Sequence, residues 1–118
     1  MVIVVDRRSV IPVQKQIALQ VKKEIILGKL REGDKLPPVR ELAQRLGVNV
    51  NTVLRALDDL VHEGVLDVQH GKGYFVSKSE ILPKELIEEL EGIAEKLKSS
   101  GVDRSLAMVL LMEVWKGE

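Results

Sequence analysis

The chain has 118 residues, of which 45% are hydrophobic and 31% are charged, a balance typical of a folded protein. It contains no cysteine, which excludes disulfide bonds, thiolate metal sites and a cysteine nucleophile. Its formal net charge is zero, with 18 Lys and Arg against 18 Asp and Glu, which alone gives no sign of a polyanionic partner.

The charges are unevenly divided along the chain. Residues 1–78 carry 13 Lys and Arg against 9 Asp and Glu, a net of +4, whereas residues 79–118 carry 5 against 9, a net of −4. This asymmetry predicts a basic half that binds a partner and an acidic tail with another role. We therefore expect two domains, residues 1–78 and 79–118.

No secretory or membrane-spanning segment is expected. The N-terminal stretch MVIVVDRRSVIP has only a four-residue apolar run and no small-residue cleavage site. No window approaches the roughly 20 apolar residues of a membrane span. The expectation is a soluble, cytoplasmic protein without a membrane partner.

The first segment predicts an arm followed by a helix. Residues Ile3 to Val5 are expected to form a short strand or an extended arm. Pro12 suits a first helical turn, and apolar residues then recur at every fourth position from Val13 to Ile25, as in an amphipathic helix. Gly28 is expected to end that helix, and REGDKLPP predicts a turn-rich connector.

Two further helices are expected after the connector. The segment VRELAQRL, from Val39 to Leu46, predicts a short helix without a side-chain cap, because Pro38 precedes it. Asn49 is a favourable N-cap for a third helix that runs to about Glu63. Only Gly-Val-Asn separates the two helices, which is the short glycine-containing turn of a helix-turn-helix.

A β-hairpin is predicted next. Two β-prone runs, Leu66 to Gln69 and Tyr74 to Ser77, flank the glycine-rich tip His70-Gly71-Lys72-Gly73. Three helices followed by a hairpin is the order of a winged helix-turn-helix. The predicted fold class is therefore mainly α with a small β-hairpin.

The tail predicts two more helices and a homodimer. PKELIEELEGIAEKLK carries one apolar stripe, and SLAMVLLMEVW, which Asp103 can cap, is apolar almost all round. A helix that is apolar on several sides must be buried on several sides. We expect a two-fold dimer interface built from Leu86, Leu90, Ile93, Leu97, Leu106, Leu110, Val114 and Trp115.

Residues 12 to 76 resemble the DNA-binding domain of the GntR family of bacterial transcription regulators. The resemblance rests on LPPVRELAQRLGV, NTVLRAL, EGVL and HGKGYFV, which occur in the family's order and spacing. The short two-helix tail and VNVNTV are similar to the YtrA-type subgroup. That resemblance implies a repressor, often of a neighbouring transporter operon and of its own promoter. It also implies a tail that serves dimerisation rather than a large effector pocket.

The resemblance also implies which residues contact DNA. Many members carry Arg where this chain has Val50 and Leu54, so the operator of another member cannot be transferred to this chain. By position, the contacts of the family fall on Arg40, Asn49, Val50, Asn51, Thr52, Leu54, His70 and Gly71.

The first turn of the third helix suits DNA chemically. A recognition helix presents this turn to the major groove, where Asn can contact adenine and Val or Leu can pack on a thymine methyl. No acidic residue there repels phosphate. Asn49, Asn51 and Thr52 thus favour A·T-rich half-sites. The alternative is that Asn49 is only an N-cap and Thr52 only a helix-start residue.

Other candidates have structural alternatives too. Leu54 could pack in the core, Arg55 could be solvated rather than bound to phosphate, and Arg40 could pair with Glu41. In the predicted wing, Lys72 offers a charge for phosphate, while the glycines Gly71 and Gly73 allow close backbone approach. A hairpin tip can also be only a turn.

No catalytic or metal site is expected. His62 and His70 lack a third ligand at metal-binding spacing, and HGKGY lacks the spacing of a P-loop. We therefore expect a binding protein without a cofactor, a homodimer on double-stranded, palindromic operator DNA. Two alternatives remain: a winged helix that binds protein instead, and a ligand-sensing repressor with a small pocket for an unidentified effector between tail and DNA-binding domain.

Overall fold

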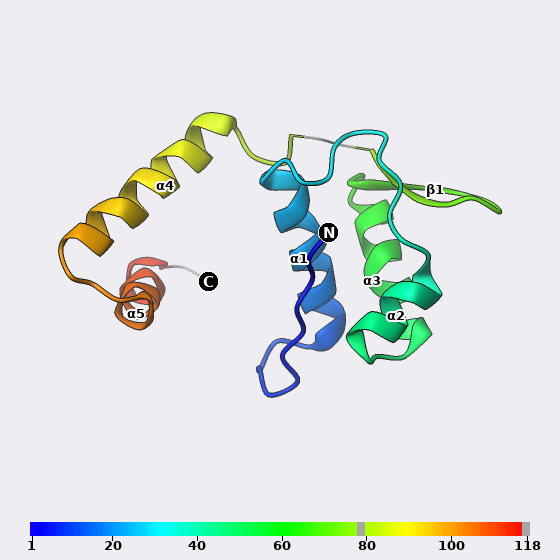
Figure 1. The fold of residues 1–118 in the computed structure, drawn as a ribbon, viewed down its shortest axis with the longest axis horizontal. Coiled ribbons are helices and arrows are strands. Elements are labelled where there is room, and N and C mark those ends of the chain that lie inside the picture. The colour runs from blue at the N-terminus through cyan, green and yellow to red at the C-terminus, as the bar shows by residue number, and fades with distance from the viewer. Residues whose placement is uncertain (78–79, 117–118) are drawn as a thin grey trace. The chain divides into compact units, whose positions relative to one another are not determined.

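A computed structural model describes residues 1–77 and 80–116 of the chain (Figure 1). The chain divides into two compact units, Met1–Ile81 and Leu82–Glu118. The domain boundary expected between residues 78 and 79 lies outside the described residues.

The first unit is a winged helix-turn-helix, which confirms the predicted fold class. In chain order its elements are α1 (Val13–Ile26), α2 (Val39–Leu46), α3 (Val50–His62), β1 (Leu66–Gln69) and β2 (Gly73–Val76). Both α1 and α2 pack against α3. Figure 1 shows α2, α3 and the hairpin on the same side of α1.

An aliphatic core holds these elements together. The α1 residues at every fourth position are buried, as predicted, except that Val13 at the start is only partly buried. Because the chain has a single Phe, Tyr and Trp, branched aliphatic side chains fill most of this core. Its fully buried members include Ile17, Val21, Val53, Ala56, Leu57 and Leu60, each with 0% of its surface exposed.

The predicted caps are confirmed at the helix-turn-helix. Helix α2 begins after Pro38 without a side-chain hydrogen bond and ends at Gly47, whose φ of 65° is left-handed. The Asn49 side chain accepts a hydrogen bond of 2.7 Å from the N–H of Asn51 and so caps α3. Both helices therefore end and begin where the cap chemistry indicates.

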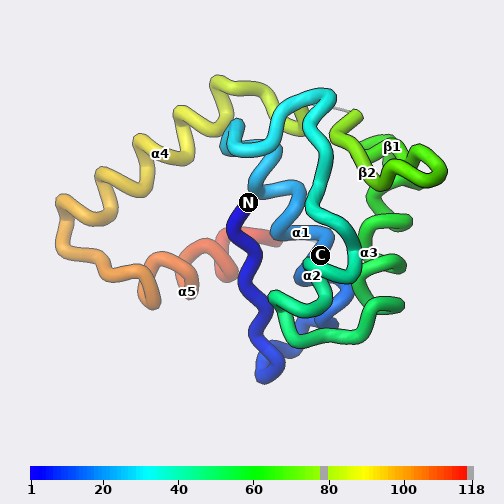
Figure 2. The backbone as a smooth tube through the Cα atoms, turned by 45° about the vertical axis from the view of Figure 1, so that its right-hand side comes forward, coloured from blue at the N-terminus to red at the C-terminus, as the bar shows by residue number. Residues whose placement is uncertain are grey.

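Figure 2 shows the hairpin that β1 and β2 form. Its second strand is shifted by one residue from the prediction. Gly73 pairs with Gln69, so the second strand is Gly73–Val76 and not Tyr74–Ser77. The N–H of Lys72 donates a 2.9 Å hydrogen bond to the Gln69 carbonyl and closes a tighter turn than expected. The wing tip is therefore His70, Gly71 and Lys72, and the placement of Gly73 at the tip was wrong.

The second unit consists of α4 (Lys84–Ser99) and α5 (Arg104–Val114). As predicted, Asp103 caps α5, since its Oδ1 accepts the N–H of Leu106 at 2.9 Å. Neither helix has a buried residue. The apolar side chains of this unit are therefore largely exposed to solvent in the single chain.

Candidate nucleic-acid interface

The first turn of α3 is polar, accessible and free of acidic residues. Asn51 is exposed and Thr52 is half-buried. The turn lies at the positive end of the helix dipole, although Asn49 already accepts the N–H groups of Asn51 and Thr52. These features suit an anion or the edge of a base.

The two asparagines have different roles within the described residues. The Oδ1 of Asn49 accepts the N–H of Asn51, which fixes the orientation of this amide group at the start of α3. Within residues 1–77 and 80–116, no hydrogen bond occupies the side chain of Asn51. A bidentate contact with adenine needs a donor and an acceptor side by side, which the Asn51 amide can turn to offer, whereas the Asn49 amide is held by its cap.

Arg40 lies in the first turn of α2 and is exposed. The alternative of an ion pair between Arg40 and Glu41 is not observed, because Glu41 pairs with Arg45 one helical turn away. In the part of the chain that the structure describes, Arg40 takes part in no ion pair. Its guanidinium group is therefore available to an external anion.

Three other predicted contacts on α3 lie in different surroundings. Val50 and Leu54 are half-buried and pack against the core, whereas Arg55 is exposed. Leu54 therefore does pack against the core, as the structural alternative expected. Its remaining exposed surface and the Arg55 side chain flank the first turn of the helix.

A hydrogen bond ties the wing to α3. The Tyr74 hydroxyl donates to Asp58 Oδ1 at 2.6 Å, and the wing tip residues His70, Gly71 and Lys72 are all exposed. Burial and the neighbouring Asp58 carboxylate raise the pKa of Tyr74 to about 12. The tyrosine therefore stays protonated and keeps donating at neutral pH.

Lys35 is a basic residue beside the wing that the sequence patterns did not single out. It forms an isolated β-bridge with Phe75, and a Cβ built on Gly73 would lie 3.4 Å from Lys35 Cε. A cleft of about 340 Å³ lies between the connector and the wing, and both Lys35 and Lys72 line it. Lys35 directly precedes Leu36, which is buried. The hydrophobic Leu36 was the local sequence signal that the connector packs on the hairpin.

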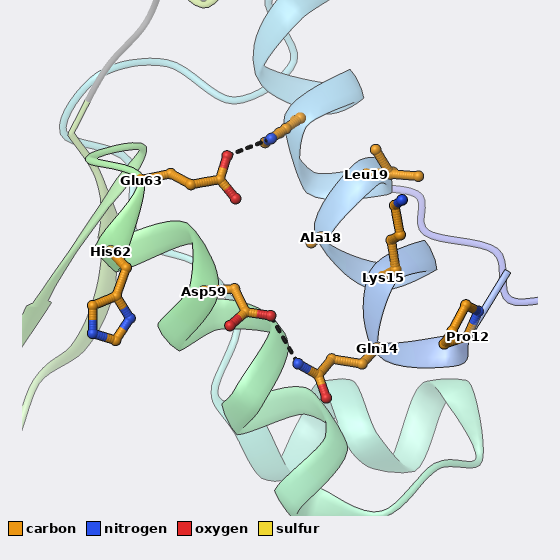
Figure 3. A pocket seen from close by; sticks show the side chains of 9 residues that line it. Pro12, Gln14, Lys15, Ala18, Leu19, Asp59, His62 and Glu63 are labelled. Atoms are coloured by element: carbon orange, nitrogen blue, oxygen red, sulfur yellow. Dashed lines mark hydrogen bonds and ion pairs between the residues drawn. The ribbon is translucent and has the colours of Figure 1, made fainter. Parts of the chain in front are cut away.

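A second groove, of about 540 Å³, separates α1 from α3 (Figure 3). Two polar contacts cross it: Gln14 donates to Asp59 at 2.7 Å, and Lys22 pairs with Glu63 at 2.5 Å. In Figure 3, dashed lines join Gln14 to Asp59 and lead from Glu63 to α1, so the two contacts connect the helices. The groove is therefore best explained as a seam that fixes α3 on α1.

The described residues form no group of three or more His, Cys, Asp or Glu side chains suited to a metal ion. Within the same residues, no helix has the length and apolar character needed to cross a membrane. The candidate binding groups of the first unit are the exposed basic and amide side chains on α2, α3 and the wing.

Comparison with known proteins gives a consistent result. The profile of the family "Bacterial regulatory proteins, gntR family" matches residues 13–76. The chain is 37% identical over 108 residues to the HTH-type transcriptional repressor YtrA of Bacillus subtilis (strain 168), which covers 91% of this chain and 82% of that protein.

Solved structures agree with the sequence comparison. YtrA from Sulfolobus acidocaldarius, a GntR-family transcription factor, is 38% identical with a TM-score of 0.62, over 81% of this chain and 99% of that chain. AraR(DBD) in complex with operator ORE1 is 30% identical with a TM-score of 0.56, over 64% and 93%. The chain belongs to the GntR family of bacterial DNA-binding transcription regulators.

Proposed function

We propose that this chain is a transcriptional repressor that binds a palindromic operator as a homodimer. The observation that carries the proposal is the first turn of α3, where the exposed Asn51 side chain is unengaged within the described residues and no acidic residue is present. The repressor name of the related YtrA supports the direction of regulation. A bound dimer would prevent transcription by occupying the promoter.

The base contacts are proposed to come from α3. Its first turn enters the major groove, where Asn51 contacts adenine through its amide group. Asn49 donates its NH₂ group to a nearby phosphate, since its oxygen remains on the Asn51 N–H. Thr52 and the methyl groups of Val50 contact neighbouring base edges, where a valine methyl can pack on the methyl group of thymine. These contacts favour A·T-rich half-sites.

The phosphate contacts are proposed to come from both sides of α3. Arg40 lies on α2 before it, and Lys72 lies at the wing tip after it. Each lacks an ion-pair partner within the described residues, so binding phosphate breaks no existing pair. The Tyr74–Asp58 hydrogen bond holds the wing at a fixed orientation for this contact.

The dimer is proposed to form through α4 and α5. A largely apolar groove of about 780 Å³ lies between them, lined by Leu90, Ile93, Leu97 and Leu111 among others. Seating a helix of a second copy there would remove this surface from water. Two linked DNA-binding units then engage half-sites whose centres lie about one helical turn apart, or a multiple of it.

The first experiment is fluorescence anisotropy of the protein with its own upstream promoter DNA at two salt concentrations. We expect tight binding that weakens steeply as salt rises, because phosphate contacts release counterions. The double variant Asn51→Ala, Arg40→Ala should lose this binding. A random duplex of equal length serves as the DNA control, and equal affinity for both duplexes would contradict an operator in that promoter.

A winged helix that binds another protein is the competing function. An apolar protein interface need not weaken with salt, whereas phosphate binding must. If the protein binds neither duplex at low salt, the repressor proposal fails and the protein-binding alternative becomes the one to pursue. A neighbouring transporter operon is the proposed second target, and its promoter fragment belongs in the same titration.

A further inference from the structure

An N-terminal arm of this chain runs along α1 (Figure 2). Side chains of α1 spaced about one helical turn apart hold it there. The arm runs from Met1 to Asp6 and is extended without being a strand. Backbone N–H groups of alternate arm residues donate to α1. These bonds run from Val2 to Glu24 Oε1 (2.8 Å), from Val4 to Gln20 Oε1 (3.5 Å) and from Asp6 to Gln16 Oε1 (2.8 Å).

The other face of the arm packs on the core. Met1, Ile3 and Val5 are partly buried against it, whereas Val2 and Val4 are 62% and 64% exposed. This alternation is the pattern of an extended segment with one buried face. Hydrogen bonds on one side and apolar packing on the other therefore fix the position at which the arm ends.

The arm ends in a tight basic turn. The Asp6 carbonyl accepts the N–H of Ser9 at 3.2 Å, and Asp6 Oδ1 accepts the N–H of Arg8 at 2.9 Å. The turn leaves the side chains of Arg7 and Arg8 exposed. Neither arginine forms an ion pair with any residue in the ranges that the structure describes.

Arg7 reaches the helix-turn-helix itself. Its Nη2 donates to the carbonyl of Gly47, which ends α2 and stands two residues before Asn49, the N-cap of α3. This bond uses one of the five N–H donors of the guanidinium group, so others remain for a ligand. This bond holds the positively charged guanidinium group of Arg7 beside the start of α3.

We propose that Arg7 binds a DNA phosphate next to the recognition helix, as an additional anchor supplied by the N-terminal arm. The inference rests on the proposed function, because it assumes that the first turn of α3 enters the major groove. Arg7 lies at the N-terminal end of α3 and the wing follows its C-terminal end, so phosphate contacts would occur at both ends of the helix. Such contacts fix register and orientation and carry no sequence information.

The test compares variants that separate charge from hydrogen bonding. Arg7→Gln keeps an N–H donor for the Gly47 carbonyl but removes the positive charge, and Arg7→Lys keeps the charge. Arg31→Gln is the matched control, because it removes an exposed arginine from the connector after the other end of α1. Each protein is titrated by anisotropy against promoter DNA and a random duplex over a series of salt concentrations.

Arg7→Gln should weaken binding to both duplexes by the same factor. The slope of log K against log salt should fall by about 0.9 for each phosphate that Arg7 no longer neutralises, or about 1.8 for a dimer with two copies. Arg7→Lys and Arg31→Gln should retain the wild-type slope. Thermal unfolding of all variants shows whether the fold is intact.

Two results would overturn the inference while leaving the proposed function intact. One is wild-type binding with an unchanged slope in Arg7→Gln. The other is an equal loss of slope in Arg7→Gln and Arg7→Lys, because Arg7→Lys keeps the positive charge and the loss would then not come from a phosphate contact of that charge. Failure of the wild-type protein to bind either duplex would instead remove the proposed function.

Discussion

The hydroxyl of Tyr74 on β2 donates a 2.6 Å hydrogen bond to Asp58 on α3, and this bond couples the wing to the recognition helix. Tyr74 has only 9% of its surface exposed, while Asp58 is exposed. The aromatic ring thus packs in the core, while its hydroxyl group donates a hydrogen bond to a carboxylate on the surface. A change that breaks this bond removes one tie between the wing and α3, while the core packing of Leu66 and Val76 remains.

The protonation of Tyr74 can be followed directly, since it is the only tyrosine in the chain. Its pKa of about 12 in the folded state exceeds the ordinary value of 10.0, so the neutral form is favoured by folding. This stabilisation is complete below pH 10 and is lost as the pH rises from 10 towards 12. We expect the ultraviolet absorbance of the phenolate to appear near pH 12 in the folded protein and near pH 10 in denaturant.

Tyr74→Phe should remove that alkaline loss of stability. At neutral pH we expect the variant to be less stable by about 1 kcal/mol, the net contribution of a typical hydrogen bond. The free energy of unfolding, measured in urea at pH 7 and at alkaline pH, gives both values. An identical alkaline loss in wild type and Tyr74→Phe would show that other groups, such as lysines, cause it.

Glu24 should make the arm sensitive to acid. It is fully buried; burial raises its pKa, but the Val2 N–H, Lys23 and Lys29 together outweigh burial and lower the pKa below 4.5. A lowered pKa means that the stabilisation is present above pH 4.5 and is lost as the pH falls through the folded-state value. We therefore expect wild type to lose more stability below pH 4.5 than Glu24→Gln does.

Hydrogen exchange of the Val2 amide tests whether Glu24 holds the arm through its hydrogen bond to Val2. At neutral pH, Glu24→Ala should remove protection of the Val2 amide and cost about 1–3 kcal/mol, because it removes a hydrogen bond to a buried charge. Glu63→Ala is a control, since that carboxylate is half-exposed in an ion pair. Unchanged protection of Val2 in Glu24→Ala would contradict the role of Glu24 in holding the arm.

Local patterns predicted most of the fold because each leaves a short-range signature. The fourfold spacing of apolar residues between Val13 and Ile25 located α1, and the Asn49 cap located the start of α3. The error at Gly73 has a physical cause. Glycine is typical of turns, yet Gly73 pairs with Gln69 because the turn at Lys72 already closes the chain.

Long-range contacts could not be predicted in the same way. Tyr74 and Asp58 are 16 residues apart, Arg7 and Gly47 are 40 apart, and neither pair has a local pattern. Glu24 lies on the buried face of α1 beside Val21 and Ile25, but a charged residue type gives no sequence signal that its side chain is covered. The start of α3 was predictable because an N-cap acts on residues next to it in the chain.

The two asparagines of α3 should separate stability from DNA binding. Asn49→Ala should destabilise the protein by about 1 kcal/mol through loss of the cap, and Asn49→Ser should restore most of that. Asn49→Asp should keep the cap and the stability but weaken DNA binding, since it places a negative charge at the start of α3, which is proposed to enter the major groove. Thermal unfolding and anisotropy on the same samples give the two readouts.

Asn51→Ala should show the opposite behaviour. Its side chain makes no hydrogen bond within the described residues, so stability should stay within about 0.5 kcal/mol of wild type. Removal of a bidentate adenine contact should weaken operator binding by about 1–3 kcal/mol for each half-site, roughly 5- to 150-fold per contact, and leave binding to a random duplex almost unchanged. Equal weakening on both duplexes would show that Asn51 contacts phosphate and not a base.

The tail should determine the oligomeric state and, through it, affinity. Leu110 on α5 has 45% of its surface exposed, although a leucine is more stable when covered. Leu110→Asp places a charge in the proposed interface, so sedimentation should give the mass of one chain where wild type gives twice that mass. Ser105→Asp adds the same charge at the start of α5, at an exposed position outside the predicted apolar set, and should remain dimeric.

Loss of the dimer should in turn weaken operator binding, because each half-site is then bound alone. Linking two binding units typically raises affinity by about 10²–10⁴-fold without any new contact, so a decrease in this range is expected for Leu110→Asp. The salt slope should fall to about half, since each chain carries half of the phosphate contacts. Because the first unit contains its own core, its thermal unfolding should not change. A Leu110→Asp protein that stays dimeric would place the interface elsewhere, whereas a monomer with wild-type affinity would show that each winged helix binds DNA independently.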